Sequence, residues 1–559
     1  MKVIIIGGVA GGMSAATRLR RLDESADITV YEQGPHVSFA NCGLPYYVGD
    51  VIEKQSALLL QTPAALWSRF RINVQVYSRV TSIDPGARTV TVLNVGSGET
   101  SVDSYDALVI STGAAPRILD IPGAERALHL RDVPDAVAIK EAVERLGEQT
   151  LTQPGAVILG AGFIGVELAE NLRHRGVAVT LVQSQATVLA QFDPEVIEPF
   201  QKTLELNGIE LKLGTRAVEI GERTVTLASG EVVPADLVIS SVGVSADHHL
   251  AVEAGLRIGD AGGIWVDDQQ RTSDPNIYAV GDAAEKINFA TGESQMVWLA
   301  NLANRHGRLV ADVIAGEKAN ARPVLGTGII GAFGMIAALT GLTEKAAKAQ
   351  SIPHSIIHLH PSSHAGYYPG AAHVAIKVLF DPETGKLLGA QATGRDGVDK
   401  RIDVLATAIF AGLTVNDLMD LELAYSPQYG SAKDAINQAG YVGNNVFESK
   451  TPNVQWYEIA ELIASGTQVI DVRTRDEYDV QSIPGSVHIP VDELRERLDE
   501  VDNTNVVVHC RVGQRGHIAT QILRASNIPA RNLDGGCLTW RAGMDSIERK
   551  NNVSSSPMP

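Results

Sequence analysis

Residues Lys2–Leu22, KVIIIGGVAGGMSAATRLRRL, decide the class of the first domain. The short apolar run predicts a buried strand, and the apolar spacing after the glycines predicts a helix. The glycines permit a tight turn and a close approach of backbone to a ligand, so that the helix N-terminus offers N–H groups to a pyrophosphate. The strict G-x-G-x-x-G pattern fails, because Val9 takes the middle position between Gly7 and Gly12. The alternative is a tight turn without a ligand.

An acidic residue follows this loop at the distance expected of a dinucleotide site. Glu32 ends the apolar segment DITVYE, 20 residues after Gly12. A carboxylate at that place binds a ribose hydroxyl. The candidate cofactor-binding residues of this unit are Gly7, Gly8, Val9, Ala10, Gly11, Gly12 and Glu32.

A second unit of the same kind is AVILGAGFIGVELAENLRHRGVAVTLVQ, residues 156–183. Its glycines match the fingerprint fully, but Gln183 stands where an acidic residue is expected, and no arginine follows closely to bind a 2′-phosphate. The unit predicts a dinucleotide site with only a weak preference for NADH over NADPH. Its candidate residues are Gly160, Gly162, Phe163, Ile164, Gly165 and Gln183.

The composition limits the classes of function. The net charge is −18, from 47 basic and 65 acidic residues, which argues against a broad surface for nucleic acid or an anionic membrane. Glycines follow only four apolar residues at the N-terminus, and no run of 18 apolar residues occurs, so we expect neither a signal peptide nor a membrane span. Three cysteines without a CxxC pair indicate no disulfide framework and a cytoplasmic location.

Three further segments repeat or extend the first pattern: YDALVISTGAAP (105–116), ADLVISSVGV (235–244) and IYAVGDAAE (277–285). Together with the two glycine loops they resemble the flavin-dependent pyridine nucleotide–disulfide oxidoreductase family over about residues 1–445. The resemblance implies FAD and NADH or NADPH as cofactors, with the Gly281–Asp282 dipeptide on the ribityl chain of the flavin. It also places Thr112, Gly113 and Gly243 among the cofactor-binding residues.

The segment SFANCGLP, residues 38–45, holds the lone cysteine of this region, Cys42. A lone redox cysteine forms either a mixed disulfide with a small thiol or a sulfenic acid, and either route needs a thiolate. We expect Asn41 to cap a short helix whose positive end lowers the pKa of Cys42. The alternative is an inert buried cysteine that packs as a small apolar residue.

The longer segment SFANCGLPYYVGD resembles the active-site segment of coenzyme A disulfide reductases and their NADH-dependent persulfide reductase relatives. The resemblance implies that Cys42 alternates between a thiolate and a disulfide with coenzyme A. Arg18 and Arg21 lie three apart on one helix face, which suits the phosphates of coenzyme A, although a solvated basic face is the alternative. The implied substrate-binding residues are Ser14, Arg18, Arg21, Ser38 and Asn41.

From about Gly326 the pattern changes to strands joined by turns, followed by two predicted helices in GVDKRIDVLATAIFAGLTVNDLMDLELAYSP. The resemblance makes this a dimerisation domain, hence a homodimer. HAGYYPG and AYSPQYG look like the two family segments that send tyrosines towards the cysteine of the other subunit, which implies catalytic roles for Tyr367 and Tyr425. Tyr368 is an alternative to Tyr367, and aromatic packing is the alternative role for the pair.

Four histidines, His354, His358, His360 and His364, raise the possibility of a metal site in this domain. His358 and His360 are expected on one strand face. No acidic residue or cysteine stands near them in the sequence, so we predict no metal.

A polar segment, NNVFESKTPNVQWYE, predicts a linker before a final domain. Four segments, TQVIDVRTRDEYD, PGSVHIPVDEL, NVVVHCRVGQRG and NLDGGCLTW, resemble a rhodanese domain in order and spacing. Cys510 follows a buried strand, and we expect a helix to open near His517. Residues 510–515 then form a loop whose N–H groups point at the sulfur, with positive charge from Arg511 and Arg515 for an anionic sulfur donor. The alternative for this domain is an inactive rhodanese-like binding module. Cys537 is predicted to be structural.

The predicted fold is α/β, with two Rossmann-like domains, an α+β dimerisation domain and a C-terminal rhodanese domain. The predicted boundaries are 1–115 and 245–322 for FAD, 116–244 for NAD(P)H, 323–443 for dimerisation, 444–458 for the linker, 459–550 for rhodanese and 551–559 for a disordered tail. The predicted function is NAD(P)H-dependent reduction of coenzyme A persulfide, polysulfide or disulfide. The alternatives are an NADH oxidase or peroxidase with a Cys42 sulfenic acid, and a flavin-bound sulfur sensor.

Overall fold

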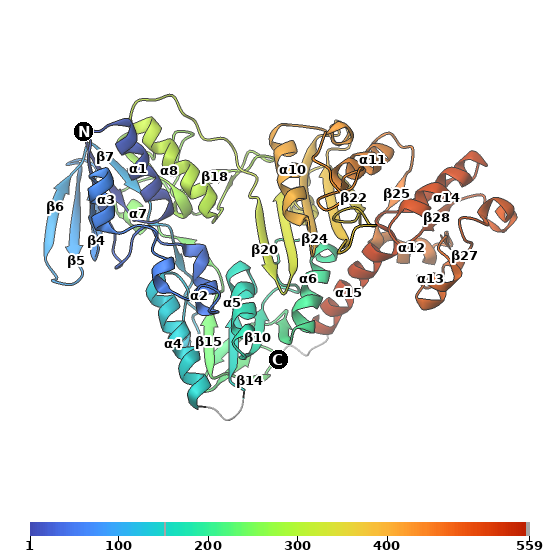
Figure 1. Ribbon diagram of the computed structural model, residues 1–559, viewed down its shortest axis with the longest axis horizontal. Coiled ribbons are helices and arrows are strands. Elements are labelled where there is room, and N and C mark those ends of the chain that lie inside the picture. Colours follow the sequence, from blue (N-terminus) through green and yellow to red (C-terminus); the bar gives the residue numbers. More distant parts are fainter. Residues whose placement is uncertain (150–152, 555–559) are drawn as a thin grey trace. The chain divides into compact units, whose positions relative to one another are not determined.

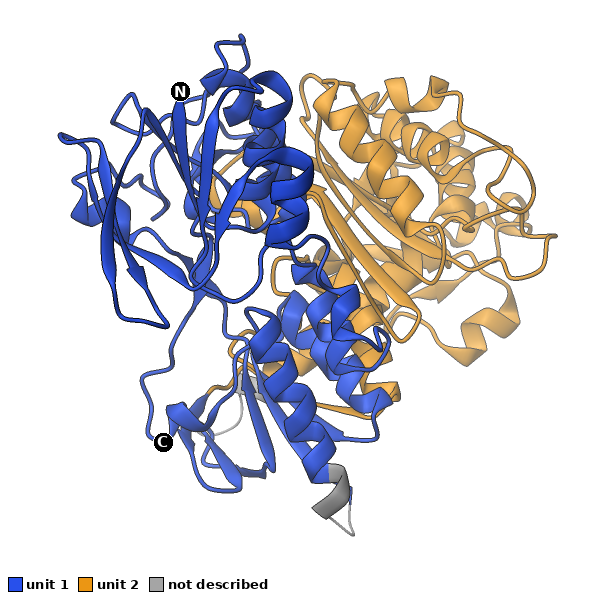
Figure 2. Ribbon diagram, turned by 60° about the vertical axis from the view of Figure 1, so that its left-hand side comes forward, with its two compact units in different colours: residues 1–182, 217–326 blue, residues 183–216, 327–559 orange. Residues whose placement is uncertain are grey.

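The computed structural model describes residues 1–149 and 153–554, which fall into two compact units (Figures 1 and 2). The first unit comprises residues 1–182 and 217–326, and the second comprises residues 183–216 and 327–559. Helix α6 (Pro194–Leu206) and strand β11 (Ile209–Leu213) therefore group with the C-terminal part of the chain, although they lie far from it in sequence.

A parallel five-stranded sheet forms the centre of the first unit. Helices α1 (Ala10–Leu22) and α8 (Ala300–Ile314) lie side by side (Figure 1). They share one core with the side chains of Val3 and Ile5. Ile4 and Ile6 point to the other face and pack against an antiparallel sheet of β4 (Ser78–Asp84), β5 (Thr89–Asn94) and β6 (Thr100–Ser104). Burial on both faces explains the continuous apolar run of β1. In sheet order the strands are β17 (Ile277–Ala279), β7 (Ala107–Ile110), β1 (Lys2–Ile6), β2 (Asp27–Tyr31) and β3 (Asn73–Gln75).

The second glycine-rich segment repeats this arrangement in the same unit. Strand β9 (Gly155–Leu159) pairs in parallel with both β10 (Ala178–Gln183) and β15 (Leu237–Ser240), and α5 (Phe163–His174) follows it. The predicted strand–turn–helix units are thus confirmed. The other elements of the unit are α2 (Leu44–Val48), α3 (Pro63–Phe70), β8 (Ala114–Pro116), α4 (Val133–Gln149), β12 (Ala217–Ile220), β13 (Thr224–Leu227), β14 (Val232–Pro234), β16 (Val244–Ala246), α7 (His249–Glu253), β18 (Lys286–Ile287) and β19 (Ser294–Gln295).

An antiparallel sheet begins the C-terminal part of the second unit. In sheet order it contains β20 (Gly328–Ala332), β21 (Met335–Gly341), β24 (Leu387–Gly394), β23 (Val374–Phe380) and β22 (Ser355–Leu359), and its helices are α9 (Glu344–Ala349), α10 (Val398–Phe410) and α11 (Ala435–Phe447).

The prediction of two consecutive helices after Gly397 is wrong. After α10 the chain makes a short 3-10 turn at Asp417–Asp420, and the next helix begins only at Ala435. Gly412 has a φ of +72° and breaks the helix, and the Asp417 carboxylate then accepts the backbone N–H of Thr414 at 2.7 Å.

A second parallel sheet completes the unit. In sheet order it contains β25 (Asn453–Val454), β29 (Ala530–Leu533), β28 (Val506–His509), β26 (Gln468–Asp471) and β27 (Val487–His488), and its helices are α12 (Ile459–Ala464), α13 (Arg475–Val480), α14 (Gln514–Ala525) and α15 (Gly536–Ser554).

Two boundary predictions at this end of the chain need correction. Helix α11 takes the first residues of the predicted linker, and the Asn453 side chain then donates to the carbonyl of Ile356 at 3.3 Å. Helix α15 takes the first four residues of the predicted tail, while residues 555–559 lie outside the described part of the chain. Within residues 1–149 and 153–554, we find no helix with the length and apolar character needed to cross a membrane.

Candidate functional site

The loop between β1 and α1 leaves no room for side chains at two glycines. Gly7 has a φ of +98°, and a Cβ there would lie 2.2 Å from the carbonyl oxygen of Ser111. A Cβ at Gly12 would lie 2.0 Å from the carbonyl oxygen of Gly7. Only glycine therefore lets α1 approach β1 this closely and keep its first N–H groups at the loop.

Glu32 lies beside this loop, as its spacing predicts. Its Oε2 accepts a hydrogen bond from the backbone N–H of Gly8 at 2.9 Å, and its Oε1 accepts one from Gly34 at 2.8 Å. The carboxylate thus fixes the loop and remains partly accessible at its edge. A ribose hydroxyl can donate to it there.

A pocket of about 290 Å³ brings most of the first set of predicted cofactor residues together. Burial raises the pKa of Asp282, whereas the charges of Lys286 and Arg131 lower it. The pocket thus offers the N–H groups at the start of α1 and the carboxylates of Glu32 and Asp282. This set fits a dinucleotide with a polyol chain. The predicted residues that line the pocket are Gly7, Val9, Ala10, Gly11, Glu32, Asn41, Thr112, Gly113, Gly281 and Asp282.

The second loop has the same construction. Gly160 has a φ of +103°, and a Cβ at Gly165 would lie 2.0 Å from the carbonyl oxygen of Gly160. Gly162 is the N-cap of α5 and faces open space, as does Gly243 across the sheet edge. Gln183 ends β10, and its carbonyl accepts the N–H of Thr215 at 3.1 Å. The backbone of this loop is therefore shaped for a second phosphate-bearing ligand.

Cys42 is exposed, but its local structure differs from the prediction. Residues Asn41–Gly43 form a single 3-10 turn with Ala40 as the N-cap, so Asn41 does not cap a helix. The buried Oδ1 of Asn41 has no hydrogen-bond partner. Surrounding protein raises the pKa of Cys42, and the carboxylates of Glu167 and Asp282 raise it further. The predicted lowering of this pKa is wrong, because burial and the two carboxylates raise it.

Glu167, on α5, is a residue near Cys42 that the sequence did not single out. Burial raises the pKa of Glu167 to about 7, although the hydroxyl of Tyr46 donates to its Oε1 at 3.3 Å. Tyr46 follows Cys42 by one turn on α2. A carboxyl that changes charge near neutral pH therefore lies close to the thiol. A signal was present in the sequence: an acidic residue in the apolar run after the second glycine loop.

Replacing Glu167 with glutamine should lower the pKa of Cys42. In the unmodified chain Glu167 gains charge as pH rises through about 7, which opposes ionisation of the nearby thiol. Rates of iodoacetamide labelling of Cys42, followed by peptide mass spectrometry from pH 6 to 10, should show a midpoint at lower pH in Glu167→Gln. Glu24→Gln, in the turn that follows α1, is the matched control. An unchanged midpoint would remove Glu167 from the electrostatics of Cys42.

The predicted substrate residues differ in how fully they are engaged. Arg18 forms an ion pair with Asp312 of α8, with Nε and Oδ1 2.6 Å apart, whereas Arg21 is exposed on the same helix. The hydroxyl of Ser14 donates to Oδ1 of Asn304 at 2.6 Å. Ser38 has a φ of 49° and donates its backbone N–H to the carbonyl of Gly8 at 2.7 Å. Ser38 thus joins the Cys42 segment to the first loop.

The structure separates the two candidate tyrosines of the first segment. The hydroxyl groups of Tyr367 and Tyr425 lie 3.1 Å apart, and both side chains are exposed. The ring of Tyr368 instead packs edge-on against His364, with centroids 5.8 Å apart. The two phenols that pair are those selected by the resemblance, which favours Tyr367 over Tyr368.

The four histidines do not converge on one point. His358 contacts Asp534 and Glu195, and His360 Nε2 lies 2.8 Å from the hydroxyl of Thr539. Nδ1 of His364 lies 3.0 Å from the hydroxyl of Ser363. Acidic residues do reach His358, but from distant parts of the sequence, which spacing alone did not indicate.

Cys510 lies at the end of β28 and is buried. The backbone N–H of Gly513 donates to its Sγ at 3.1 Å. Helix α14 begins at Gln514, three residues before the predicted start, because Gly513 with a φ of +98° is its N-cap. Arg515 lies in the first turn and donates to both oxygens of Glu477 at 2.6 and 2.7 Å, which lowers the pKa of Glu477 to about 2. The site therefore combines a backbone N–H that donates to the sulfur with an arginine, Arg515, that is held by Glu477.

Three family models match the chain. The pyridine nucleotide-disulphide oxidoreductase model matches residues 1–303, its dimerisation-domain model matches residues 333–435, and the rhodanese-like domain model matches residues 456–543. The chain belongs to the pyridine nucleotide-disulphide oxidoreductase family. Its fold class is confirmed, with the rhodanese-like domain at the C-terminal end.

Some relatives of this oxidoreductase cover about four fifths of the chain, and others cover nearly all of it. The coenzyme A disulfide reductase of Staphylococcus epidermidis is 34% identical over 441 residues, which cover 79% of this chain and 99% of that protein. The structure of reduced Bacillus anthracis CoADR-RHD is 42% identical with a TM-score of 0.95 and covers 98% of both chains. A NAD-dependent persulfide reductase from A. fulgidus is 34% identical with a TM-score of 0.89, covering 97% of this chain and 100% of that one.

Besides Glu167, two further charged residues of these sites were not predicted from the sequence: one lies in the pocket and the other beside the Cys510 loop. Arg131 lines the first pocket, and one of its terminal nitrogens lies 2.6 Å from where a Cβ of Gly113 would stand. Glu477 holds Arg515. Neither stands in a glycine loop or next to a cysteine, so no local pattern pointed to them.

Proposed function

We propose that this oxidoreductase uses NAD(P)H and a bound FAD to reduce coenzyme A persulfide, polysulfide or disulfide through Cys42, while Cys510 carries sulfane sulfur. The observation that carries the proposal is that one chain holds two differently placed cysteines. Cys42 is exposed and follows Asn41 of the pocket, whereas Cys510 is buried and its Sγ accepts the backbone N–H of Gly513. The names of the relatives, coenzyme A disulfide reductase and persulfide reductase, support it.

The chemistry follows from the thiol. A bound flavin supplies the passage of an electron pair from the nicotinamide to a disulfide. The Cys42 thiolate attacks the inner sulfur of coenzyme A persulfide, which releases HS⁻ and leaves Cys42 in a disulfide with coenzyme A. Two electrons from NAD(P)H then break that S–S bond, which restores the Cys42 thiolate and, with one proton, free coenzyme A. The Tyr367–Tyr425 pair is suited to donate this proton to the leaving sulfur in a homodimer.

Anaerobic NAD(P)H consumption with each oxidant tests the proposal. We expect fast turnover with coenzyme A persulfide or disulfide, release of sulfide from the persulfide, and slow turnover with hydrogen peroxide; oxygen is then added separately. Fast consumption with peroxide or oxygen alone would establish the oxidase or peroxidase alternative. Slow turnover with every oxidant, despite a full complement of flavin, would favour the sensor.

Gln183 should allow both nicotinamide cofactors, with NADH somewhat preferred. Glutamine hydrogen-bonds a ribose hydroxyl but does not repel a 2′-phosphate, whereas a carboxylate near the surface repels it by about 1 kcal/mol. We therefore expect Gln183→Glu to lower kcat/KM for NADPH about fivefold while kcat/KM for NADH holds or rises. Gln185→Glu, two residues further on, is the control. A strong NADPH preference in the unmodified chain would contradict this role of Gln183.

Arg18 and Arg21 are proposed to bind the phosphates of coenzyme A. Replacing both with alanine should raise KM for coenzyme A persulfide about tenfold, since each lost bond joins charged groups. Cysteine persulfide, which has no phosphates, should be reduced at a nearly unchanged rate. Because Arg18 already pairs with Asp312, the exposed Arg21 should account for most of the effect. Arg69→Ala on α3 removes one exposed positive charge, as Arg21→Ala alone does, and is the control for that single variant. Equal losses on both substrates would contradict the assignment.

Assembly and location complete the proposal. The dimerisation-domain match at residues 333–435 and the exposed Tyr367–Tyr425 pair support a homodimer. Three cysteines that are all free thiols support a cytoplasmic location, where thiols stay reduced. Sedimentation equilibrium measures the mass of the assembly directly and so tests the homodimer.

We also propose the predicted domain boundaries, apart from the corrected linker and tail.

A further inference from the structure

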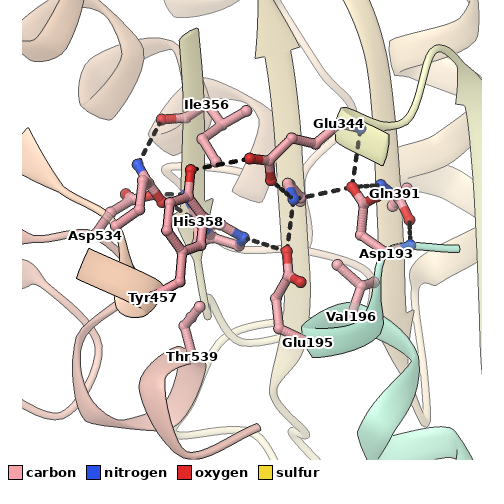
Figure 3. Close-up of polar contacts among 12 residues, drawn as sticks. Asp193, Glu195, Val196, Glu344, Ile356, His358, Gln391, Tyr457, Asp534 and Thr539 are labelled. Carbon is pink, nitrogen blue, oxygen red and sulfur yellow. Dashed lines mark hydrogen bonds and ion pairs between the residues drawn. The ribbon is translucent and has the colours of Figure 1, made fainter. Parts of the chain in front are cut away.

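A buried charged cluster joins three segments of the second unit (Figure 3). It is formed by Asp193, Glu195, Glu344, His358, Lys377 and Asp534. Asp193 and Glu195 begin α6, Lys377 and His358 come from neighbouring strands of the dimerisation sheet, and Asp534 follows β29 of the rhodanese-like domain. All six side chains are buried, so the four carboxylates depend on the positive charges of Lys377 and His358 and on hydrogen bonds.

Lys377 occupies the acidic end of the cluster. Its Nζ lies 2.9 Å from Asp193, 2.5 Å from Glu195 and 2.5 Å from Glu344. Three carboxylates this close together are also the ligand set of a cation site. Here the ammonium group provides the positive charge, so this group of acids is explained without a metal.

His358 occupies the other end, between two carboxylates. Its Nδ1 lies 2.7 Å from Oδ2 of Asp534, and its Nε2 lies 3.1 Å from Oε1 of Glu195. A carboxylate accepts at both ring nitrogens only if both carry protons, so the ring is an imidazolium. Burial alone would lower the pKa of His358, but Asp534 and Glu195 raise it, to about 9.

Asp534 is bound to His358 twice. Its second oxygen, Oδ1, accepts the backbone N–H of His358 at 3.0 Å. The rhodanese-like domain is therefore held to strand β22 through both the main chain and the ring of one residue. His360, on the same face, adds a contact to Thr539 at the start of α15.

Two glycines connect this anchor directly to the loop of Cys510. Gly535 and Gly536 follow Asp534 with φ of +65° and +62°. A Cβ on Gly535 would lie 2.7 Å from Cβ of His358, and a Cβ on Gly536 would lie 2.5 Å from the carbonyl oxygen of Cys510. One layer of backbone thus separates His358 from the catalytic loop, and glycine is needed at both positions.

Hydrogen bonds fix the loop to that layer. The backbone N–H of Cys537 donates to the carbonyl of Cys510 at 2.8 Å, and that of Leu538 donates to the carbonyl of Arg511 at 3.0 Å. A displacement of residues 534–538 must therefore displace Cys510 relative to the N–H of Gly513 that donates to its sulfur. At a site of this kind, small displacements change the reactivity of the thiolate.

We propose that His358 of the dimerisation domain is a positioning residue for sulfur transfer at Cys510, so that the rhodanese-like site is completed by a domain outside it. This inference rests on the proposed sulfur-carrying role of Cys510. The step concerned is attack of the Cys510 thiolate on the outer sulfur of thiosulfate, which gives Cys510 persulfide and sulfite. Cyanide then takes the outer sulfur as thiocyanate and restores the thiolate, so atoms and charges balance.

The test compares His358→Gln with Thr393→Val in the full chain with its flavin. Thr393 is buried and donates to the carbonyl of Val196 at 3.1 Å, so it joins the same α6 to the same sheet without reaching residues 534–538. We expect His358→Gln to lower kcat for thiosulfate-to-cyanide transfer about tenfold or more, with little change in KM for thiosulfate. Thr393→Val should leave transfer unchanged. Both variants should keep the NADH-dependent reductase rate.

A pH profile adds a readout that loss of folding would not imitate. The charged groups that face His358 are Asp534, Glu195 and Lys377. The raised pKa means that the anchoring charge is complete below about pH 6.5 and is lost as pH rises through about 9. Transfer by the unmodified chain should therefore fall on that alkaline limb, and His358→Gln should lack the limb.

A second variant covers the case in which His358→Gln does not fold. The double variant His358→Gln with Asp534→Asn removes both charges and keeps an amide pair at the same contact, and it should also transfer sulfur slowly. Unchanged transfer in a folded variant would overturn the proposal, as would equal losses of transfer and reduction or an equal loss in Thr393→Val. If Cys510→Ser retained transfer, the proposed role of Cys510 itself would fail, and that result is distinguishable from all of these.

Discussion

Cys42→Ser should abolish NADH-dependent reduction of coenzyme A persulfide and disulfide, with a loss of about a thousandfold or more and with FAD still bound. A serine hydroxyl is not ionised near neutral pH and cannot form an S–S bond, so the step that captures the substrate disappears. Cys42 is exposed and follows Asn41, whose buried Oδ1 has no partner in the pocket wall. The thiol is therefore available to a substrate, and the site around it is prepared for a polar group.

Cys537→Ser is the matched control for this change. It exchanges the same atoms in the first turn of α15, where the side chain is buried, and should leave the reductase rate intact. FAD content is measured by absorbance after gel filtration, and NADH oxidation is followed anaerobically with purified coenzyme A persulfide. Reduction by Cys42→Ser at the normal rate, with flavin bound, would remove Cys42 from the mechanism.

The first-domain fold and its glycines were predictable because their causes are local. Gly7 and Gly12 have backbone conformations or contacts that exclude a Cβ, and the continuous apolar run Val3–Ile6 is buried on both faces of a parallel sheet. Such requirements restrict the residue type at fixed positions, so they can be recognised in the sequence. The same holds for Glu32, whose distance from the loop follows from the length of one helix and one strand.

Other features depended on contacts that no local pattern records. Asn41 has the chemistry of an N-cap, but the turn that follows is too short for one, and the pKa of Cys42 is set instead by burial and by Glu167, more than a hundred residues away. His358 showed the same limit. Its neighbours in sequence suggested no acidic partner, whereas the fold supplies Asp534 and Glu195 from two other segments.

The predicted linker raised the question of how sulfur passes from Cys510 to Cys42. A flexible coil would let the rhodanese-like domain move, but α11 runs to Phe447, and Asp534 is held by His358 only one backbone layer from Cys510. The described residues between these points thus hold the domain against the dimerisation sheet. We propose that coenzyme A, whose thiol can accept the sulfane sulfur, carries it from Cys510 to Cys42.

Cys510→Ser should therefore eliminate transfer of sulfur from thiosulfate or polysulfide, by about a thousandfold or more, and leave NADH-dependent reduction of preformed coenzyme A persulfide largely intact. The amide of Gly513 then faces a hydroxyl that cannot hold a sulfane sulfur. Cys42→Ser should give the reverse pattern, with transfer retained and reduction lost. Both rates are measured on the same preparations, and a mixture of the two variants with coenzyme A and thiosulfate should recover NADH oxidation. If Cys510→Ser also stops reduction of the preformed persulfide, the two cysteines act as one obligatory site and coenzyme A is not the carrier.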